Sequence, residues 1–174
     1  MKSILSIPHR LDRASLCCRA IIETPKGSRT KYDYDPESGL FFLDKVLPEG
    51  MCFPLDFGFI PSTKGEDGDP LDILVLHDEP IPVGALLEVR LIGVIVGEQT
   101  EDGQTVRNDR LIGVSKPSHI YQNITDAEQF SETFLHQLTR FWVNYNELRG
   151  RMFEVKALRG PGEAATLIDA ASIE

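Results

Sequence analysis

The sequence predicts a small β-barrel with helices packed on its outside, a mainly β fold of the α+β class. Short runs of apolar and β-branched residues, separated by turn residues, dominate residues 16–115. Apolar residues recur at steps of three and four only later, over residues 130–148. A chain in which many short strands precede one long helix favours a sheet closed on itself and flanked by helices.

Six strands are expected in the first part of the chain, at residues 16–23, 31–35, 40–46, 72–76, 86–96 and 111–114. The second and third of these form a hairpin around the turn Pro36-Glu37-Ser38-Gly39. A polar loop over residues 98–109, with Asp102-Gly103 as its turn, is expected to connect the last two.

One long helix is expected next. Either Ser131 or Asp126 can cap its start, and Gly150 can end it. Its apolar face contains Phe130, Phe134, Leu138, Phe141 or Trp142, Tyr145 and Leu148. A strand over residues 152–158 and a short second helix over residues 163–172 follow, so two helices flank the predicted barrel.

Length and charge limit the classes of protein to which the chain can belong. Its 174 residues suffice for one domain with a hydrophobic core, which we expect to span residues 1–174. Asp and Glu number 27 against 18 Lys and Arg, which gives a net charge of −9. A nucleic-acid-binding surface needs a basic footprint, so nucleic acid is not expected as a partner.

The sequence also predicts a cytoplasmic protein without a membrane partner. Its longest apolar stretch, residues 85–97, is interrupted by Glu88 and Arg90, so no membrane-spanning helix is expected. The apolar run near the N-terminus is too short for a signal peptide. Three cysteines without a C-x-x-C pattern are typical of free thiols in a reducing cytosol.

A cluster of carboxylates is the most informative motif. Asp67, Asp69 and Asp72 fall within six residues, and an apolar strand begins directly after them. Two carboxylates about 4 Å apart repel each other by roughly 4 kcal/mol at an effective dielectric of about 20. A hard divalent cation removes this repulsion, and the all-oxygen ligand set indicates Mg²⁺ or Mn²⁺ rather than Zn²⁺. The alternative interpretation is an acidic turn whose side chains cap local amides.

Basic residues near this cluster indicate a phosphate ligand. Mg²⁺ shares its coordination shell between carboxylates, waters and substrate phosphates. Lys31 and Lys45 lie in the predicted hairpin, and Arg110 follows the polar loop. Each alone is an ordinary surface charge, but together with the acidic cluster they fit a metal–phosphate site.

The motif Asp67-Gly68-Asp69-Pro70-Leu71-Asp72 resembles the signature of the soluble, magnesium-dependent (family I) inorganic pyrophosphatases. The resemblance covers residues 16–155. Its other elements, in chain order, are Ile22-Glu23-Thr24-Pro25, Lys31-Tyr32-Asp33, Glu37-Ser38-Gly39, Phe53-Pro54, Gly58-Phe59-Ile60 and the helical stretch 141–148. The resemblance implies a closed OB-like barrel flanked by helices, several Mg²⁺ ions with Mn²⁺ as a substitute, and a cytoplasmic homo-oligomer, a hexamer in bacterial members.

The resemblance further implies hydrolysis of pyrophosphate to two phosphates and a role for each matching residue. Asp67 and Asp72 would ligate metal directly, and Glu23 would do so through water. Asp69 would be the general base for the attacking water. Lys31 and Tyr145 would hold phosphate oxygens, with Lys45 and Arg110 as further substrate-binding cations.

Several positions depart from the family pattern, and most of them fall on the site. Asp33 stands where the family has Glu, Lys45 where it has Arg, and Asp56 where it has Asn. Phe53 and Phe57 replace two tyrosines, which removes two phenolic hydroxyls.

The polar loop and the long helix depart further. The family's Asp-x-Lys, whose Asp ligates metal, reads Asn108-Asp109-Arg110, and the family's phosphate-binding Lys after Tyr145 is Asn146. The missing carboxylate can be replaced from Glu98, Glu101, Asp102 or Asp109. Two alternatives to a pyrophosphatase therefore stay open: a divergent paralogue that binds metal and another phosphorylated ligand, and a catalytically weak scaffold or binding protein.

Overall fold

The strands of this protein form one large sheet and one separate hairpin. The computed structural model describes residues 3–173. Within them lie β1 (Cys17–Thr24), β2 (Thr30–Asp35), β3 (Leu40–Val46), β4 (Asp56–Phe59), β5 (Asp72–Leu76), β6 (Leu86–Glu101), β7 (Gln104–Arg107), β8 (Arg110–Ser115), α1 (Glu132–Glu147), β9 (Met152–Arg159) and α2 (Pro161–Ala171). Two short 3₁₀ helices cover Ile4–Ser6 and Ala127–Gln129.

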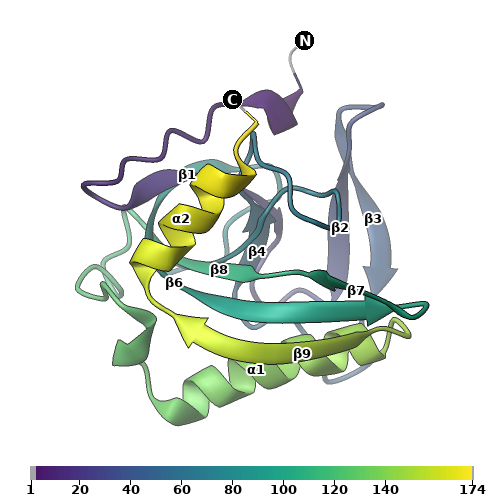
Figure 1. Ribbon diagram of the computed structural model, residues 1–174. Coiled ribbons are helices and arrows are strands. Elements are labelled where there is room, and N and C mark those ends of the chain that lie inside the picture. Colours follow the sequence, from purple (N-terminus) through teal and green to yellow (C-terminus); the bar gives the residue numbers. More distant parts are fainter. Residues whose placement is uncertain (1–2, 174) are drawn as a thin grey trace.

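The pairings of the large sheet close on themselves. β1 pairs with both β4 and β6, and the path from β4 to β6 runs through β5 and β8. Every pairing in this ring is antiparallel except that of β5 with β8, which is parallel. The predicted mainly β fold, closed on itself and flanked by two helices, is confirmed. The hairpin β2–β3 stands beside the ring (Figure 1).

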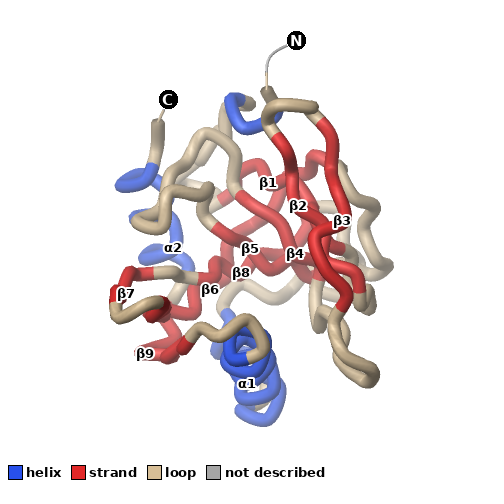
Figure 2. The backbone as a smooth tube through the Cα atoms, turned by 90° about the vertical axis from the view of Figure 1, so that its right-hand side faces the viewer, coloured by secondary structure: helices blue, strands red, loops and turns tan. Residues whose placement is uncertain are grey.

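The two helices cover different parts of the sheet. α1 packs on β9, whereas α2 packs on β6, and Figure 2 shows the two helices well apart. On α1, Leu138, Trp142 and Tyr145 are buried in one apolar cluster with Phe53 and Phe57. On α2, small residues face a second cluster, which allows the helix backbone to approach the sheet closely. No helix within residues 3–173 is long and apolar enough to cross a bilayer.

The alternatives for the start of α1 are resolved by hydrogen bonds. The Ser131 hydroxyl accepts a hydrogen bond from the backbone N–H of Phe134 at 3.2 Å and caps α1. Asp126 instead caps the preceding 3₁₀ helix, where it accepts from the N–H of Glu128 at 2.9 Å. Gly150, with φ of 71°, follows the helix end as predicted.

Two predictions about the strands were wrong. The polar loop expected over residues 98–109 is a hairpin: β6 continues to Glu101 and pairs with β7. Asp102 and Gly103 have φ of 50° and 76°, and positive φ at both central residues is the geometry that matches the twist of two paired strands. β4 was missed because it has only four residues, one of them Gly58, and a pattern this short does not indicate a strand.

A buried carboxylate in β4 has one oxygen without a hydrogen-bond partner. Asp56 Oδ1 accepts from the N–H groups of Lys26 and Ile81, at 2.8 and 3.0 Å. Its other oxygen, Oδ2, is buried and has no hydrogen-bond partner. Burial therefore raises the pKa of Asp56, against the lowering effect of the two N–H groups. A neutral side chain of the same shape suits this position better.

We expect Asp56→Asn to raise the free energy of unfolding by about 1 kcal/mol at neutral pH, because it keeps the acceptor Oδ1 and removes a buried charge. The gain should shrink as the pH falls, since Asp56 then takes up a proton in the folded state. Urea unfolding of the variant and the wild type measures both effects. Asp56→Ala is the matched control and should lose about 1–3 kcal/mol, because two buried N–H groups lose their acceptor. An Asp56→Asn variant less stable than the wild type would contradict this account.

Candidate active site

A cavity of about 780 Å³ opens between the hairpin β2–β3, the loop before β5, the hairpin β6–β7 and the end of α1. Its charged lining is predominantly acidic. The carboxylates are Glu23, Asp33, Glu66, Asp67, Asp69, Asp72, Glu101 and Asp102, and the basic groups are Lys31, Arg110, Arg149 and Arg151. Because eight carboxylates face four basic groups, the acidic side of the cavity can hold a polyanionic ligand only together with cations.

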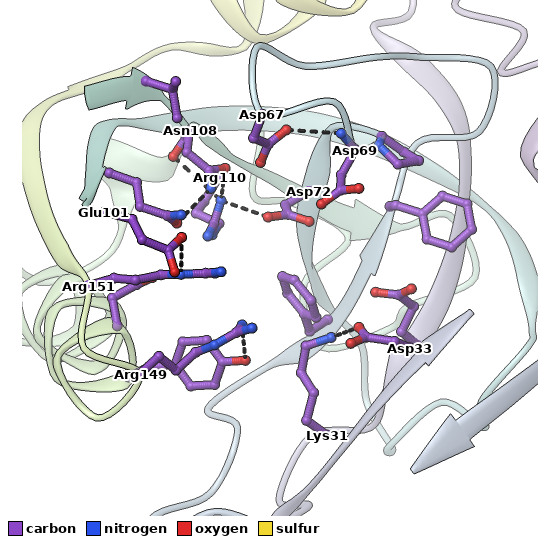
Figure 3. A pocket seen from close by; sticks show the side chains of 18 of the residues that line it. Lys31, Asp33, Asp67, Asp69, Asp72, Glu101, Asn108, Arg110, Arg149 and Arg151 are labelled. Atoms are coloured by element: carbon purple, nitrogen blue, oxygen red, sulfur yellow. Dashed lines mark hydrogen bonds and ion pairs between the residues drawn. The ribbon is translucent and has the colours of Figure 1, made fainter. Parts of the chain in front are cut away.

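The loop before β5 holds its carboxylates at the rim of this cavity. Asp67 Oδ1 accepts from the N–H of Asp69 at 3.1 Å, and the Asp69 carbonyl accepts from the N–H of Gly65 at 2.7 Å. Gly68 has φ of 93°, a conformation that this turn requires and that glycine adopts without strain. The turn leaves Asp67 and Asp69 exposed, and Figure 3 shows their carboxylates above that of Asp72.

An ion pair joins the acidic loop to the opposite wall. Asp72 and Arg110 are the first residues of β5 and β8, and the parallel register places them side by side. Asp72 Oδ2 lies 2.6 Å from Arg110 Nη1, and the Arg110 side chain is only 5% exposed. Its guanidinium lies over the rings of Trp142 and Phe153, at 4.8 and 5.4 Å from their centroids. These contacts fix the guanidinium at the base of the cavity.

Three carboxylates of the site, Glu23, Asp67 and Asp72, have raised pKa values. Burial raises the pKa of Glu23 to about 7, although Lys31 lowers it. Burial also raises the pKa of Asp72, against the effect of Arg110, and Asp67 and Asp69 raise it further. For Asp67 the pKa is raised as well, again mainly by burial. The cavity therefore holds more carboxylate than its own cations can neutralise.

The donor set fits a hard cation that keeps part of its water shell. Among the described residues, no group of three or more His, Cys, Asp or Glu side chains is close enough to form a metal site by itself. Mg²⁺ does not need such a cage, since it binds through one or two carboxylates and completes its shell with waters and substrate phosphates. Oxygen ligands with raised pKa values suit such a cation, because its charge favours the ionised form of each carboxyl.

Most residues predicted for the site do line the cavity. They are Glu23, Lys31, Asp33, Asp67, Asp69, Asp72, Asp102, Asn108, Arg110 and Tyr145. Lys31 is buried, forms an ion pair with Asp33, and lies 5.4 Å from the centroid of the Phe57 ring. Burial lowers the pKa of Lys31, whereas the charge of Glu23 raises it.

The two phenylalanines that replace tyrosines form an apolar wall. Phe57 lines the cavity and packs on Trp142, and Phe53 packs behind both.

The structure does not bring Lys45 and Asp109 to the cavity. The Lys45 ammonium lies 2.9 Å from the carboxylate of its neighbour Asp44. Asp109 is buried on the other side of the chain, where it accepts from the N–H of Gly97 at 3.1 Å and pairs with Arg107 at 2.7 Å. Neighbouring residues of an extended chain point to opposite faces, which separates Asp109 from Asn108 and Arg110.

Of the remaining acids that could replace the missing family carboxylate, Glu98 is also absent from the lining. It pairs with Lys156 at 3.1 Å. Glu101 and Asp102 do line the cavity, and Glu101 forms an ion pair with Arg151 at 2.7 Å. Of these two carboxylates, the one from Glu101 is therefore occupied by a guanidinium.

The sequence analysis missed three residues that line the cavity, Gln99, Arg149 and Arg151. Gln99 Oε1 accepts from Asn108 Nδ2 at 3.0 Å, an uncharged pair across the unexpected hairpin. Arg149 donates to the Tyr145 hydroxyl at 3.2 Å, and Arg151 follows two residues later. The Arg-Gly-Arg sequence after the predicted helix was the available signal. Asn146 does not contribute a cation, and its amide donates to the Trp142 carbonyl at 2.9 Å.

A sequence profile of the family "Inorganic pyrophosphatase" matches residues 20–173, a range that includes every charged residue lining the cavity. The chain is 37% identical over 151 residues to the inorganic pyrophosphatase of Thermus thermophilus, a match that covers 87% of this chain and 83% of that protein. It is 40% identical over 151 residues to the inorganic pyrophosphatase of Nanoarchaeum equitans, with 86% and 91% covered.

Solved structures show the same similarity. The crystal structure of inorganic pyrophosphatase from Thermus thermophilus superposes with a TM-score of 0.88 at 34% identity and covers 98% of this chain and 97% of that one. The inorganic pyrophosphatase from Neisseria gonorrhoeae superposes with a TM-score of 0.85 at 26% identity, with 97% and 96% covered.

We expect Glu23→Gln to stabilise the metal-free protein at alkaline pH and to have little effect at acid pH. The pKa of Glu23 rises from 4.5 to about 7 on folding, so the folded state loses stability as the pH rises through this window. After allowance for the open cavity, the gain at about pH 8 should be about 1–2 kcal/mol. Thermal unfolding in a chelator, at about pH 5 and about pH 8, measures it. An equal effect at both pH values would show that ionisation of Glu23 is not the cause.

Proposed function

Because the chain belongs to the inorganic pyrophosphatase family, we propose that it hydrolyses pyrophosphate to two phosphates with the help of divalent magnesium. One observation supports the proposal for this chain. Asp67, Asp69 and Asp72 line the same cavity as Lys31, Arg110 and Tyr145. None of the observations favours a divergent ligand or a scaffold without activity.

Asp67 and Asp72 are the residues that would hold the metal, with Glu23 acting through water. Bound Mg²⁺ supplies positive charge to the phosphate oxygens and lowers the pKa of the attacking water. Mn²⁺ is a possible substitute, since it prefers the same oxygen ligands.

Asp69 is the proposed general base. It stands on the exposed rim of the turn, between two carboxylates, where a water that approaches the bound phosphate can reach it. Accepting the proton of that water makes it a stronger nucleophile toward phosphorus, and the bond to the leaving phosphate breaks in line with the attack.

Lys31, Arg110 and Tyr145 hold the substrate. The ammonium and the guanidinium neutralise negative charge that spreads over the phosphate oxygens in the transition state. Burial raises the pKa of Tyr145, so its hydroxyl stays protonated and donates a hydrogen bond. Trp142 and Phe57, which also line the cavity, give this side an apolar wall that strengthens these charge interactions.

We further propose that residues 1–174 act as one domain in the cytoplasm and assemble into a homo-oligomer, a hexamer by family resemblance. The exposed apolar side chains of β3, Leu40, Phe42, Leu43 and Val46, support assembly. Light scattering on the purified protein measures the number of subunits.

Phosphate release from pyrophosphate in the presence of Mg²⁺ is the direct test. We expect Asp69→Asn to lower kcat by about 10²–10⁴-fold, the usual contribution of a general base, with little change in the Mg²⁺ concentration needed. Asp67→Asn should instead raise that concentration, because it removes a proposed metal ligand.

Glu79→Gln is the control, since Glu79 is exposed and does not line the cavity. It should keep wild-type activity. Absence of phosphate release by the wild type in both Mg²⁺ and Mn²⁺ would refute the proposed function.

A further inference from the structure

The cavity is divided by charge into two halves. Figure 3 shows the carboxylates of Asp67, Asp69 and Asp72 on one side, and the guanidinium groups of Arg149 and Arg151 on the other, with Arg110 between them. The basic half is built from the start of β8 and from the turn between α1 and β9. Arg110 contacts the proposed metal ligand Asp72, whereas Arg149 and Arg151 form no ion pair with Asp67 or Asp72.

We propose that Arg149 and Arg151, together with Arg110, form an oxyanion subsite that holds one phosphoryl group of the substrate directly, without a metal ion on that side. This inference rests on the proposed function, since it names the groups that bind one end of pyrophosphate. It assigns Arg149 and Arg151 as additional substrate-binding residues.

Arg149 is oriented by Tyr145. Its guanidinium lies 5.6 Å from the centroid of the tyrosine ring and donates one hydrogen bond, at 3.2 Å, to the hydroxyl. Tyr145 is buried, so it fixes the position of the arginine at the cavity wall. A guanidinium has five N–H donors in a planar fork that matches two oxygens of a phosphoryl group. The end of α1 thus presents a cation from Arg149, while the Asn146 amide is bonded to its own helix.

The neighbouring amides make a metal ion unsuitable on this side. The side chains of Gln99 and Asn108 are hydrogen-bonded to each other, and the Asn108 side-chain oxygen Oδ1 accepts from Arg110. These groups carry no charge and do not neutralise the guanidinium. The carboxylates of this half are Glu101 and Asp102, and Glu101 is paired with Arg151 at 2.7 Å. Arg110 is paired with Asp72, whereas Arg149 forms no ion pair among the described residues, so its charge is available to an anion.

The Glu101–Arg151 pair does not block the subsite. The two side chains are 43% and 26% exposed, and an ion pair at that exposure is weak. A phosphoryl group carries more negative charge than a carboxylate and can displace Glu101 from Arg151. Arg151 therefore serves as a second, exchangeable donor beside Arg149.

Binding of methylene diphosphonate, a pyrophosphate analogue that is not hydrolysed, tests the subsite without turnover. In a chelator that removes divalent ions, calorimetry should show binding to the wild type with a Kd of about 1 mM or tighter. Arg149→Gln should weaken this metal-free binding by about 10- to 100-fold, and Arg149→Lys by less, since a lysine keeps the charge but not the fork. Arg151→Gln should have the smaller effect.

Arg140→Gln is the matched control, because Arg140 lies on the exposed side of the same helix and does not line the cavity. It should bind the diphosphonate like the wild type. Circular dichroism and thermal unfolding show whether each variant is folded. The double change Gln99→Glu with Asn108→Asp adds two carboxylates and should abolish metal-free binding while it increases the number of Mg²⁺ ions bound per chain.

The outcomes separate this inference from the proposed function. A wild type that hydrolyses pyrophosphate but binds the diphosphonate only with Mg²⁺ would overturn the subsite and leave the activity. Unchanged metal-free binding by the folded Arg149→Gln variant would overturn it as well. A wild type that binds the diphosphonate through Arg149 without metal, and releases no phosphate, would refute the hydrolase and keep the subsite.

Discussion

The ion pair between Asp72 and Arg110 is the contact on which the site depends. It exists because β5 and β8 run parallel and begin at the same level of the sheet, so the residues that start them are neighbours. One partner belongs to the acidic loop, the other to the wall that carries the arginines. Arg110 in turn is held against Trp142 and Phe153, which ties the polar site to the apolar cluster beneath α1. Removing either partner of the Asp72–Arg110 pair would leave a largely buried charge without its counter-charge. The positions of the sheet, of α1 and of the site residues therefore depend on one another.

Charge is distributed over the cavity in a way that suits a polyanionic ligand with a metal at one end. Around the loop before β5, burial and mutual repulsion raise the pKa values of Glu23, Asp67 and Asp72, which is the condition that a divalent cation relieves. On the opposite wall, the amides of Gln99 and Asn108 lie in the same lining as the guanidiniums of Arg110, Arg149 and Arg151. The substitutions at Asn108 and Asn146, which looked like losses in the sequence, are accompanied by the cations Arg149 and Arg151 in the same cavity.

Much of the fold was open to prediction because its signals are local. The strand at Asp72–Leu76 and the hairpin of β2 and β3 follow from apolar runs and turn residues, and α1 follows from its 3.6-residue period and its cap at Ser131. The hairpin of β6 and β7 was missed because its paired residues, apart from Val106, are polar, so alternation gives no signal. For the site, the signature around Asp67 was sufficient to find the acidic half. Lys45 and Asp109 were misplaced because motif position does not say which way a side chain points.

The sequence by itself determined the fold class and the acidic loop and predicts an oxygen-ligated cation there, since the signal for each lies in residues close together in the chain. Only the tertiary structure decided which distant residues share the cavity. The parallel pairing of β5 with β8 places Arg110 beside Asp72, the turn after α1 carries Arg149 and Arg151, and the side chain of Asp109 is turned away. These arrangements depend on the register of strands and on the packing of a helix, and neither is encoded in any short segment.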